Sequence, residues 1–335
     1  MFWRVADGWG SMRRMLRYAA DRRTLLWCLA MPVVALSMYA APELIPYLCP
    51  VSCYLALSAG VIAHNHNHSP TFRNRKLNEA MGMWLSLFYG YPTFVWIPTH
   101  NLNHHKFVNK AGDATITWRY SKKHNFLVAV SFPFVSTYFQ QEPTKAFIEK
   151  ARERNRPLFR QIVLQYVIWG GTHAALLGLA MVLHGVGGGA RIWAFAFLIP
   201  AFFSLWTIMF FNYIQHVHTD PWSEHDHSRS FTGRLINFFL FNNGLHAAHH
   251  EMPGQHWSLL PEAHAKIAAD IHPDLKPVSF FGWCFRSYVL AALFPRFGTK
   301  QVGRAPYEPP TGEKVNVTFG DELPAVDAGI NVARV

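Results

Sequence analysis

The chain has 335 residues, of which 50% are apolar and only 15% are charged. Soluble domains usually carry roughly a quarter charged residues, so this composition argues against a soluble protein. The mean hydropathy of only +0.05 shows that membrane spans cannot make up the whole chain and that a sizeable part lies outside the bilayer. The net charge of +11 would suit nucleic-acid binding, but the positions of the basic residues argue against it. Six precede residue 25, fourteen lie between residues 64 and 161, one is Arg191 and ten follow residue 212. Because Lys and Arg mark the cytoplasmic side of membrane proteins, the pattern indicates topology, with all but Arg191 on one side.

Four apolar segments have about the length that a membrane-spanning helix needs. The first two are joined by residues 41–46 and the last two by residues 184–189, and both links contain Pro or Gly with few charges, as tight turns do. We therefore expect two helical hairpins, which place both termini and the central segment in the cytoplasm. The expected spans are residues 25–40, 47–63, 162–183 and 190–211.

The remaining parts of the chain suggest a domain organisation around these spans. We expect residues 1–24 to be a retained cytoplasmic amphipathic segment, because a basic lead of this length is unlike that of a cleaved signal peptide. Residues 25–298 should form the membrane domain, and the polar residues 299–335, rich in Pro and Gly, a surface tail. Within the domain, residues 81–98 predict one helix buried at or lying on the membrane interface, and residues 126–139 are too short for a confident span.

Histidines gather in four clusters whose spacing predicts metal ligands. Residues three or four apart share one helix face, with Cβ atoms about 5–6 Å apart, which lets two imidazoles point at one ion. The first and third clusters directly follow expected spans, and the other two follow 32 and 30 residues later. Each expected helical hairpin is therefore followed by one cluster at the membrane edge and by a second cluster in the cytoplasmic part of the chain. The clusters are HNHNH at residues 64–68, HNLNHH at 100–105, NYIQH at 212–216 and HAAHH at 246–250.

Nine of the ten histidines in these clusters, all except His66, are candidate ligands. Nine are too many for one ion and divide naturally between two, because a structural zinc takes only four protein ligands. Imidazoles with few carboxylates favour iron over calcium, magnesium or structural zinc. The Glu-x-x-His pattern of soluble di-iron bundles occurs once, at Glu224–His227, so that fold is not expected. His218 and Asp220 could orient the ligands. The isolated histidines are expected to be structural: His124, His173, His184, His256, His264 and His272.

These boxes resemble those of the membrane fatty acid desaturase and hydroxylase superfamily, and Asn212 with His216 resembles the Asn-x3-His element of its acyl desaturases. The similarity covers roughly residues 45–265 and extends to bacterial lipid desaturases, a branch that includes terminal-alkene-forming fatty acid decarboxylases. One departure is that three residues separate His100 from His104, where many desaturases have two. The resemblance implies an all-α integral membrane protein with four transmembrane helices in two hairpins and a cytoplasmic helical cap holding a di-iron site. The implied metal ligands are His64, His68, His100, His104, His105, Asn212, His216, His246, His249 and His250.

The resemblance also implies an activity, namely dioxygen-dependent oxidation of a fatty acid or acyl lipid by two iron ions, with no catalytic residue beyond the ligands. Desaturation ranks first, then decarboxylation of a free acid to a terminal alkene, then hydroxylation, because these outcomes differ by only a few kcal/mol in competing barriers. A metal transporter is the alternative from another class, but transporters place ionisable residues inside spans, and only His173 lies well within one here. No G-x-G-x-x-G or Cys₄ iron–sulfur motif occurs, so a separate ferredoxin or small cytochrome should supply electrons. The expected location is a bacterial inner membrane, with the site on the cytoplasmic side.

Overall fold

The computed structural model describes residues 15–310 as helices joined by loops, with a single isolated bridge between Leu16 and Phe72. The chain separates into two compact units. The first contains residues 15–94 and Arg156–Leu205, and the second contains Val95–Asn155 and residues 206–310. The expected all-helical architecture is therefore confirmed for the described part of the chain.

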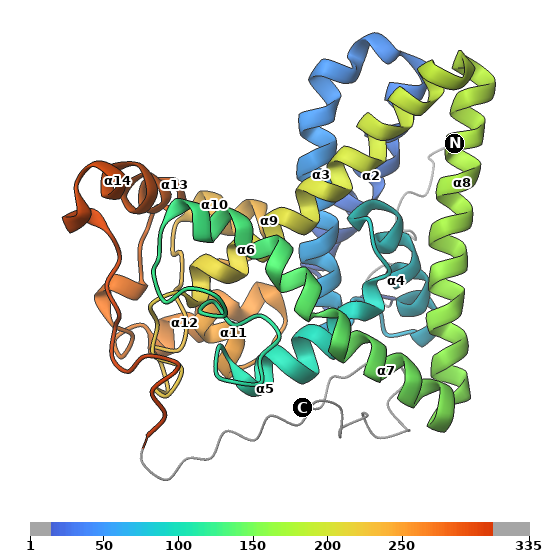
Figure 1. The fold of residues 1–335 in the computed structure, drawn as a ribbon. Helices are drawn as coiled ribbons and strands as arrows, with labels where there is room; N and C mark the ends of the chain where they lie inside the picture. The colour runs from blue at the N-terminus through green and yellow to red at the C-terminus, as the bar shows by residue number, and fades with distance from the viewer. Residues whose placement is uncertain (1–14, 311–335) are drawn as a thin grey trace, which may run out of the picture. The chain divides into compact units, whose positions relative to one another are not determined.

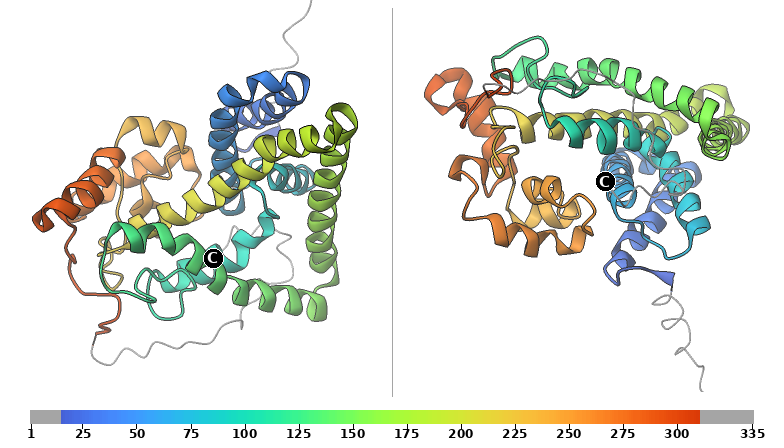
Figure 2. Two further views of the ribbon diagram at one scale, coloured as in Figure 1. Left: turned by 45° about the horizontal axis from the view of Figure 1, so that its top comes forward. Right: turned by 90° about the horizontal axis from the view of Figure 1, so that it is seen from below.

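The first unit is built from long apolar helices (Figure 1). Helices α2 and α3 pack side by side in all three views (Figures 1 and 2). The elements are α2 (Asp21–Ala40), η1 (Pro42–Leu44), α3 (Ile45–His68), α4 (Arg75–Tyr89), η2 (Thr93–Val95, whose last residue belongs to the second unit), α8 (Arg156–Trp193), η4 (Ala194–Leu198) and the first part of α9 (Ile199–His216).

Polar side chains tie these helices together through backbone carbonyls. Ser52 donates to the carbonyl of Ala196 at 3.0 Å, and Ser204 donates to the carbonyl of Ala56 at 2.8 Å. The Tyr39 hydroxyl likewise donates to a carbonyl of α8, at 3.2 Å. Such contacts stabilise helix pairs in an apolar environment, where helices gain little from the hydrophobic effect.

Three helical stretches are long and apolar enough to cross a membrane: Asp21–Ala40, Pro42–His68 and Arg156–His216. The third has 61 residues, about 90 Å of helix at 1.5 Å per residue, or roughly three bilayer cores. It is interrupted at Gly185, whose backbone is non-helical, with φ 74° and ψ 164°. Figure 1 shows the chain reversing at this end of α8. Gly185 lies inside the link that we predicted at residues 184–189, and a positive φ favours glycine there.

The prediction of one helix over residues 81–98 is wrong. Helix α4 ends at Tyr89, because Gly90 adopts a left-handed conformation with φ 95° and caps the helix by donating to the Ser86 carbonyl. A Cβ at this glycine would overlap Ala201. Beyond Gly90 the chain forms η2 and then starts a π-helix at Ile97.

The second unit consists of shorter helices around the end of α9 (Figure 1). One core surrounds Tyr213, Ile214 and Phe231, and another lies between α11 and α12, around Ala248 and Leu260. The elements are η3 (Ile97–His104), α5 (His105–Phe107), α6 (Phe126–Phe139), α7 (Gln141–Arg154), α10 (Arg234–Phe239), α11 (His246–Glu251), η5 (Trp257–Leu259), α12 (Leu260–Ile267), η6 (Pro273–Leu275), α13 (Phe280–Cys284), η7 (Phe285–Leu290), α14 (Ala291–Leu293) and η8 (Pro295–Phe297).

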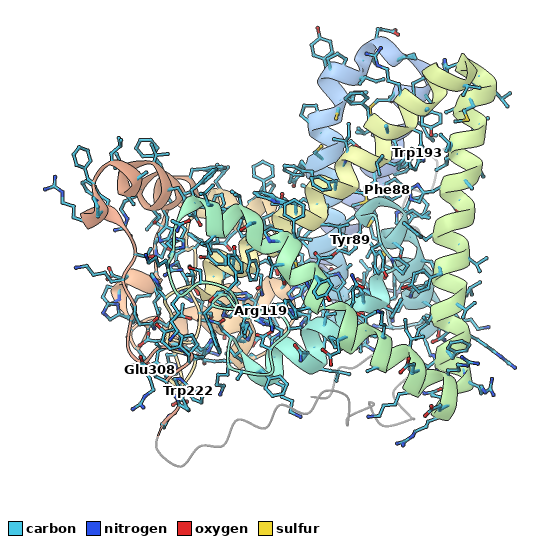
Figure 3. All side chains as sticks on the ribbon, viewed as in Figure 1. Phe88, Tyr89, Arg119, Trp193, Trp222 and Glu308 are labelled. Atoms are coloured by element: carbon cyan, nitrogen blue, oxygen red, sulfur yellow. The ribbon has the colours of Figure 1, made fainter. Side chains whose placement is uncertain are left out.

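Residues 299–310, the described part of the expected tail, contact other residues of the second unit. The Thr299 carbonyl and hydroxyl contact His218 Nδ1, and the Ala305 carbonyl accepts from Trp222 Nε1 at 3.0 Å. Figure 3 labels Trp222 and Glu308 close together in this region. Residues 311–335 of the predicted tail, and residues 1–14 of the predicted amphipathic segment, lie outside the described residues.

Candidate metal centre

The second unit brings seven of the nine predicted histidine ligands into two groups. Within each group every histidine offers one ring nitrogen, and these nitrogens all lie within 4.8 Å of one another. We call them the three-histidine group and the four-histidine group. The first contains His100, His105 and His249, and the second contains His104, His216, His246 and His250.

A π-helix explains how the second box serves both groups. An α-helix would place residues five apart about 140° from one another around the axis. The stretch Ile97–His104 is instead π-helical, with i→i+5 hydrogen bonds, and the Nε2 atoms of His100 and His105 lie 3.0 Å apart. His104 stacks on His100 at 5.2 Å between ring centroids, yet it belongs to the other group. His100 therefore pairs with His105, five positions on. The four-residue spacing between His100 and His104 does not mean that these two histidines would bind the same ion.

The four-histidine group has a feature that calls for a cation. His104 Nδ1 lies 2.8 Å from the Asp113 carboxylate, and His216 Nδ1 lies 3.2 Å from the His227 carbonyl. Both partners accept hydrogen bonds, so both Nδ1 atoms carry a proton, and in the neutral form of each ring the Nε2 atom presents a lone pair. Those two Nε2 atoms lie 3.1 Å apart. Two lone pairs at that distance repel each other unless a cation, either a metal ion or a shared proton, lies between them.

The three-histidine group leads to the same conclusion by a simpler argument. The Nε2 atoms of His100, His105 and His249 lie 3.0, 3.0 and 3.4 Å from one another. A neutral imidazole presents either an N–H or a lone pair at this atom, so at least two of the three present the same kind. A triangle of hydrogen bonds therefore cannot satisfy all three pairs, whereas lone pairs directed at one metal ion can.

Burial favours the neutral, metal-binding form of His250. Burial and the neighbouring His105 and His246 hold the pKa of His250 well below its ordinary value, so this ring is neutral at physiological pH. His216 and His104 are almost fully buried, at 0% and 1% exposed. Metal ligation requires neutral imidazole, so the groups are suited to hold metal ions.

Asp113 is a supporting residue that the sequence analysis missed. It is fully buried and accepts hydrogen bonds from His104, from the Asn109 and Thr115 backbones and from the Thr115 hydroxyl. Burial acts to raise the pKa of Asp113. The attraction of His104 and the hydrogen bonds from His104 and Thr115 outweigh this effect and hold the pKa of Asp113 below its ordinary value. Its loop is further fixed by Arg119, labelled in Figure 3, which donates to the Asp113 carbonyl at 2.9 Å. A single acidic residue in a loop carries no periodic signal, so only its contact reveals its role.

Replacing Asp113 by Asn should weaken metal binding without removing a ligand. The amide keeps the shape of the carboxylate but loses the charge that orients His104, and such supporting changes typically cost about 10–100-fold in metal affinity. Chelator competition on the purified protein measures this loss. Asp220→Asn is the matched control, because among residues 15–310 the Asp220 carboxylate accepts from the Trp222 and Arg304 backbones and not from a histidine of either group. Equal metal retention in both variants would contradict the role of Asp113.

The first unit carries the other two predicted histidine ligands. His64 and His68 lie at the end of α3, one turn apart, with ring centroids at 4.9 Å. His66, the middle histidine of that box, has structural contacts instead, since its ring nitrogens lie 3.0 Å from the Thr71 hydroxyl and 3.2 Å from the Asn78 carbonyl.

Asn212, the asparagine of the Asn-x3-His element, lies beside the four-histidine group. Its Nδ2 is 3.4 Å from His104 Nε2, and its buried Oδ1 has no hydrogen-bond partner among residues 15–310. An oxygen in that position can accept a hydrogen bond from a metal-bound water. His218 and Asp220, in contrast, have partners away from both groups, namely Thr299 for His218 and the Trp222 and Arg304 backbones for Asp220. The expectation that these two orient the ligands is not supported.

Helices of membrane-crossing length and two largely buried groups of imidazoles that could hold metal ions are typical of a membrane metalloprotein. The chain belongs to the fatty acid desaturase family, whose model matches residues 40–282. Comparison with curated proteins and with solved structures gave no match. The family agrees with the resemblance of the histidine boxes and makes the chain a member of a superfamily of membrane di-iron oxidoreductases.

Proposed function

We propose that this protein is a membrane di-iron enzyme that uses dioxygen to introduce a double bond into a fatty acyl chain. The observation that carries the proposal is the division of imidazoles into two buried groups whose Nε2 atoms face one another at 2.9–3.4 Å. His64 and His68 are proposed to join the ligands, as the family resemblance implies, and Asn212 to hold a metal-bound water. Two bound irons would supply the oxidising power to remove hydrogen from an unactivated chain.

The reaction needs electrons as well as dioxygen. Converting one –CH₂–CH₂– unit to –CH=CH– with one O₂ consumes two electrons and two protons and releases two waters. A separate ferredoxin or small cytochrome is proposed to deliver these electrons. The residues of this chain would hold the irons and exclude water, and Asp113 and the His227 carbonyl orient the rings of His104 and His216.

The proposed topology follows from the basic residues and the apolar helices. Four crossing segments are proposed, and the stretch Arg156–His216 contributes two of them, one on each side of Gly185. This arrangement places the histidine boxes and both termini on the cytoplasmic side, and we propose a bacterial inner membrane. Cysteine labelling at residue 187, predicted outside, and at residue 121, predicted inside, would test it, and equal accessibility from one side would contradict it.

Mass spectrometry of lipids, free acids and headspace from cells expressing the wild type or His249→Ala tests the activity. We expect an unsaturated acid in wild-type cells that is absent with the variant, because His249 belongs to the three-histidine group. An alkene one carbon shorter than its parent acid, lost in the same variant, would establish decarboxylation instead. Purified protein should need an added reduced ferredoxin, and turnover with dioxygen and lipid alone would contradict the separate donor. Identical products from wild type and variant would contradict the role of the metal centre.

A further inference from the structure

A buried arginine in the second unit lies outside both histidine groups. Arg229 is 1% exposed and lies beside the apolar core formed by residues such as Phe132 and Phe231. Its guanidinium donates to the Ile214 carbonyl, near the end of α9, and lies 4.8 Å from the centre of the Trp283 ring. It forms no ion pair with a carboxylate of residues 15–310. Buried charges in proteins are normally paired, so this cation lacks an expected partner.

The side chains around Arg229 also lack acceptors. Arg229 Nε, Trp283 Nε1 and the Tyr288 hydroxyl are all buried without a hydrogen-bond partner among residues 15–310, and so is His124 Nε2. The rings form one cluster: His124 lies 5.2 Å from Tyr288 and 5.9 Å from Trp283 between centroids, and Trp283 lies 6.0 Å from Tyr288. Each buried polar group without a partner keeps an uncompensated desolvation cost, so a ligand that accepted these hydrogen bonds would remove a substantial penalty.

Three of these atoms, on Arg229, Trp283 and Tyr288, are hydrogen-bond donors, and His124 Nε2 is a donor in one of its two neutral tautomers. Burial is the main cause that lowers the pKa of Arg229 to about 10, which leaves it a cation at neutral pH. Burial, with His218 and Arg229 nearby, lowers the pKa of His124 to about 3, so its ring is neutral. Its Nδ1 lies 3.1 Å from the Tyr213 hydroxyl, and in the tautomer in which that hydroxyl donates, the proton of the ring is on Nε2. A cation and several neutral donors without an acceptor are complementary to an anion.

We propose that Arg229, Tyr288, Trp283 and His124 bind the free carboxylate of the fatty-acid substrate. The planar guanidinium matches a carboxylate, which it can bind through parallel hydrogen bonds. The surrounding aromatic rings suit an apolar chain and not a hydrated headgroup. This inference rests on the proposed function and deepens it, because it makes the substrate an unesterified acid and not a thioester or a phospholipid.

A structural role is the competing explanation for Arg229. Cations at helix C-termini stabilise the last carbonyls, and Arg229 contacts one of them in α9. That role accounts for the bond to Ile214 but not for the neighbouring hydroxyl without a partner. Tyr288→Phe therefore separates the two explanations: it removes only an unsatisfied hydroxyl, which should leave stability unchanged or raised, whereas a carboxylate site would lose a donor.

The test is binding of palmitate, laurate, methyl palmitate and hexadecyl phosphate to the purified full-length protein, by calorimetry in detergent. We expect wild type to bind at least one acid about tenfold more tightly than the ester, as a charge-assisted hydrogen bond implies. Arg229→Gln should abolish this preference. Tyr288→Phe should reduce it about threefold without lowering the melting temperature, and the control Tyr138→Phe, at an exposed tyrosine, should not change it.

Several outcomes would overturn the inference: equal affinity for acids and ester in wild type, an unchanged preference in both Arg229→Gln and Tyr288→Phe, or tighter binding of the phosphate than of either acid. Should Arg229→Gln fail to fold, Tyr288→Phe alone decides. Iron content measured on the same samples keeps the proposed function separate. A preference for the acid without bound iron would contradict the proposed di-iron enzyme and still support the carboxylate site. Bound iron without a preference for the acid would support the di-iron enzyme and contradict the carboxylate site.

Discussion

The His216→Ala protein should lose one of two irons and all lipid oxidation. His216 is fully buried, and its Nε2 lies 3.1 Å from that of His104 and 2.9 Å from that of His246. Changes to residues that merely support a ligand cost roughly 10–100-fold in metal affinity, so removal of a ligand should cost more. Iron per protein, measured by elemental mass spectrometry after dialysis against a chelator, checks this. Free imidazole should partly restore iron, because the truncation leaves room for it.

His66→Gln is the control for that experiment. His66 is buried and belongs to a histidine box, but its ring contacts Thr71 and Asn78, and a glutamine side chain can replace part of this hydrogen bonding. We expect this variant to keep both irons and its activity. If His216→Ala kept as much iron as His66→Gln, the four-histidine group would not be a metal site.

Gly189→Ala should destabilise the protein more than any other glycine-to-alanine change in α8. A Cβ at Gly189 would overlap the backbones of Ala180 and Met181 and lie 2.5 Å from the Ala180 carbonyl oxygen. Ala180 is itself fully buried, so this is a close backbone approach at the turn near Gly185. Backbone cannot move aside as a flexible side chain can, and overpacking of this kind costs about 3 kcal/mol. The melting temperature in detergent should fall clearly.

The matched control lies two residues away. Gly187 has no atom within 4 Å of an added Cβ, and alanine favours the helix over glycine by about 1 kcal/mol. Gly187→Ala should therefore leave the melting temperature unchanged or raise it slightly. Opposite effects at these two positions would establish that the chain folds back on itself here, and a harmless Gly189→Ala would contradict the close packing.

The sequence by itself determined the helical class, the apolar segments and the identity of the family. These features are local: a run of apolar residues forms a helix wherever it is placed in an apolar environment, and Gly185 falls inside a link predicted from composition. The histidine boxes are also local, because residues three or four apart share a helix face. His246 and His250, four residues apart, belong to one group, whereas His249, three residues from His246, belongs to the other.

Only the tertiary structure decided how the histidines are divided and what supports them. Because Ile97–His104 is π-helical, His100 joins His105 in the three-histidine group and His104 joins the other. The roles of Asp113 and Arg229 likewise depend on contacts between distant segments, Arg229 lying beside Ile214 and Trp283. A lone acidic or basic residue in a loop has no sequence pattern. Its function depends on the residues that folding brings next to it and on the loss of hydration when its side chain is buried.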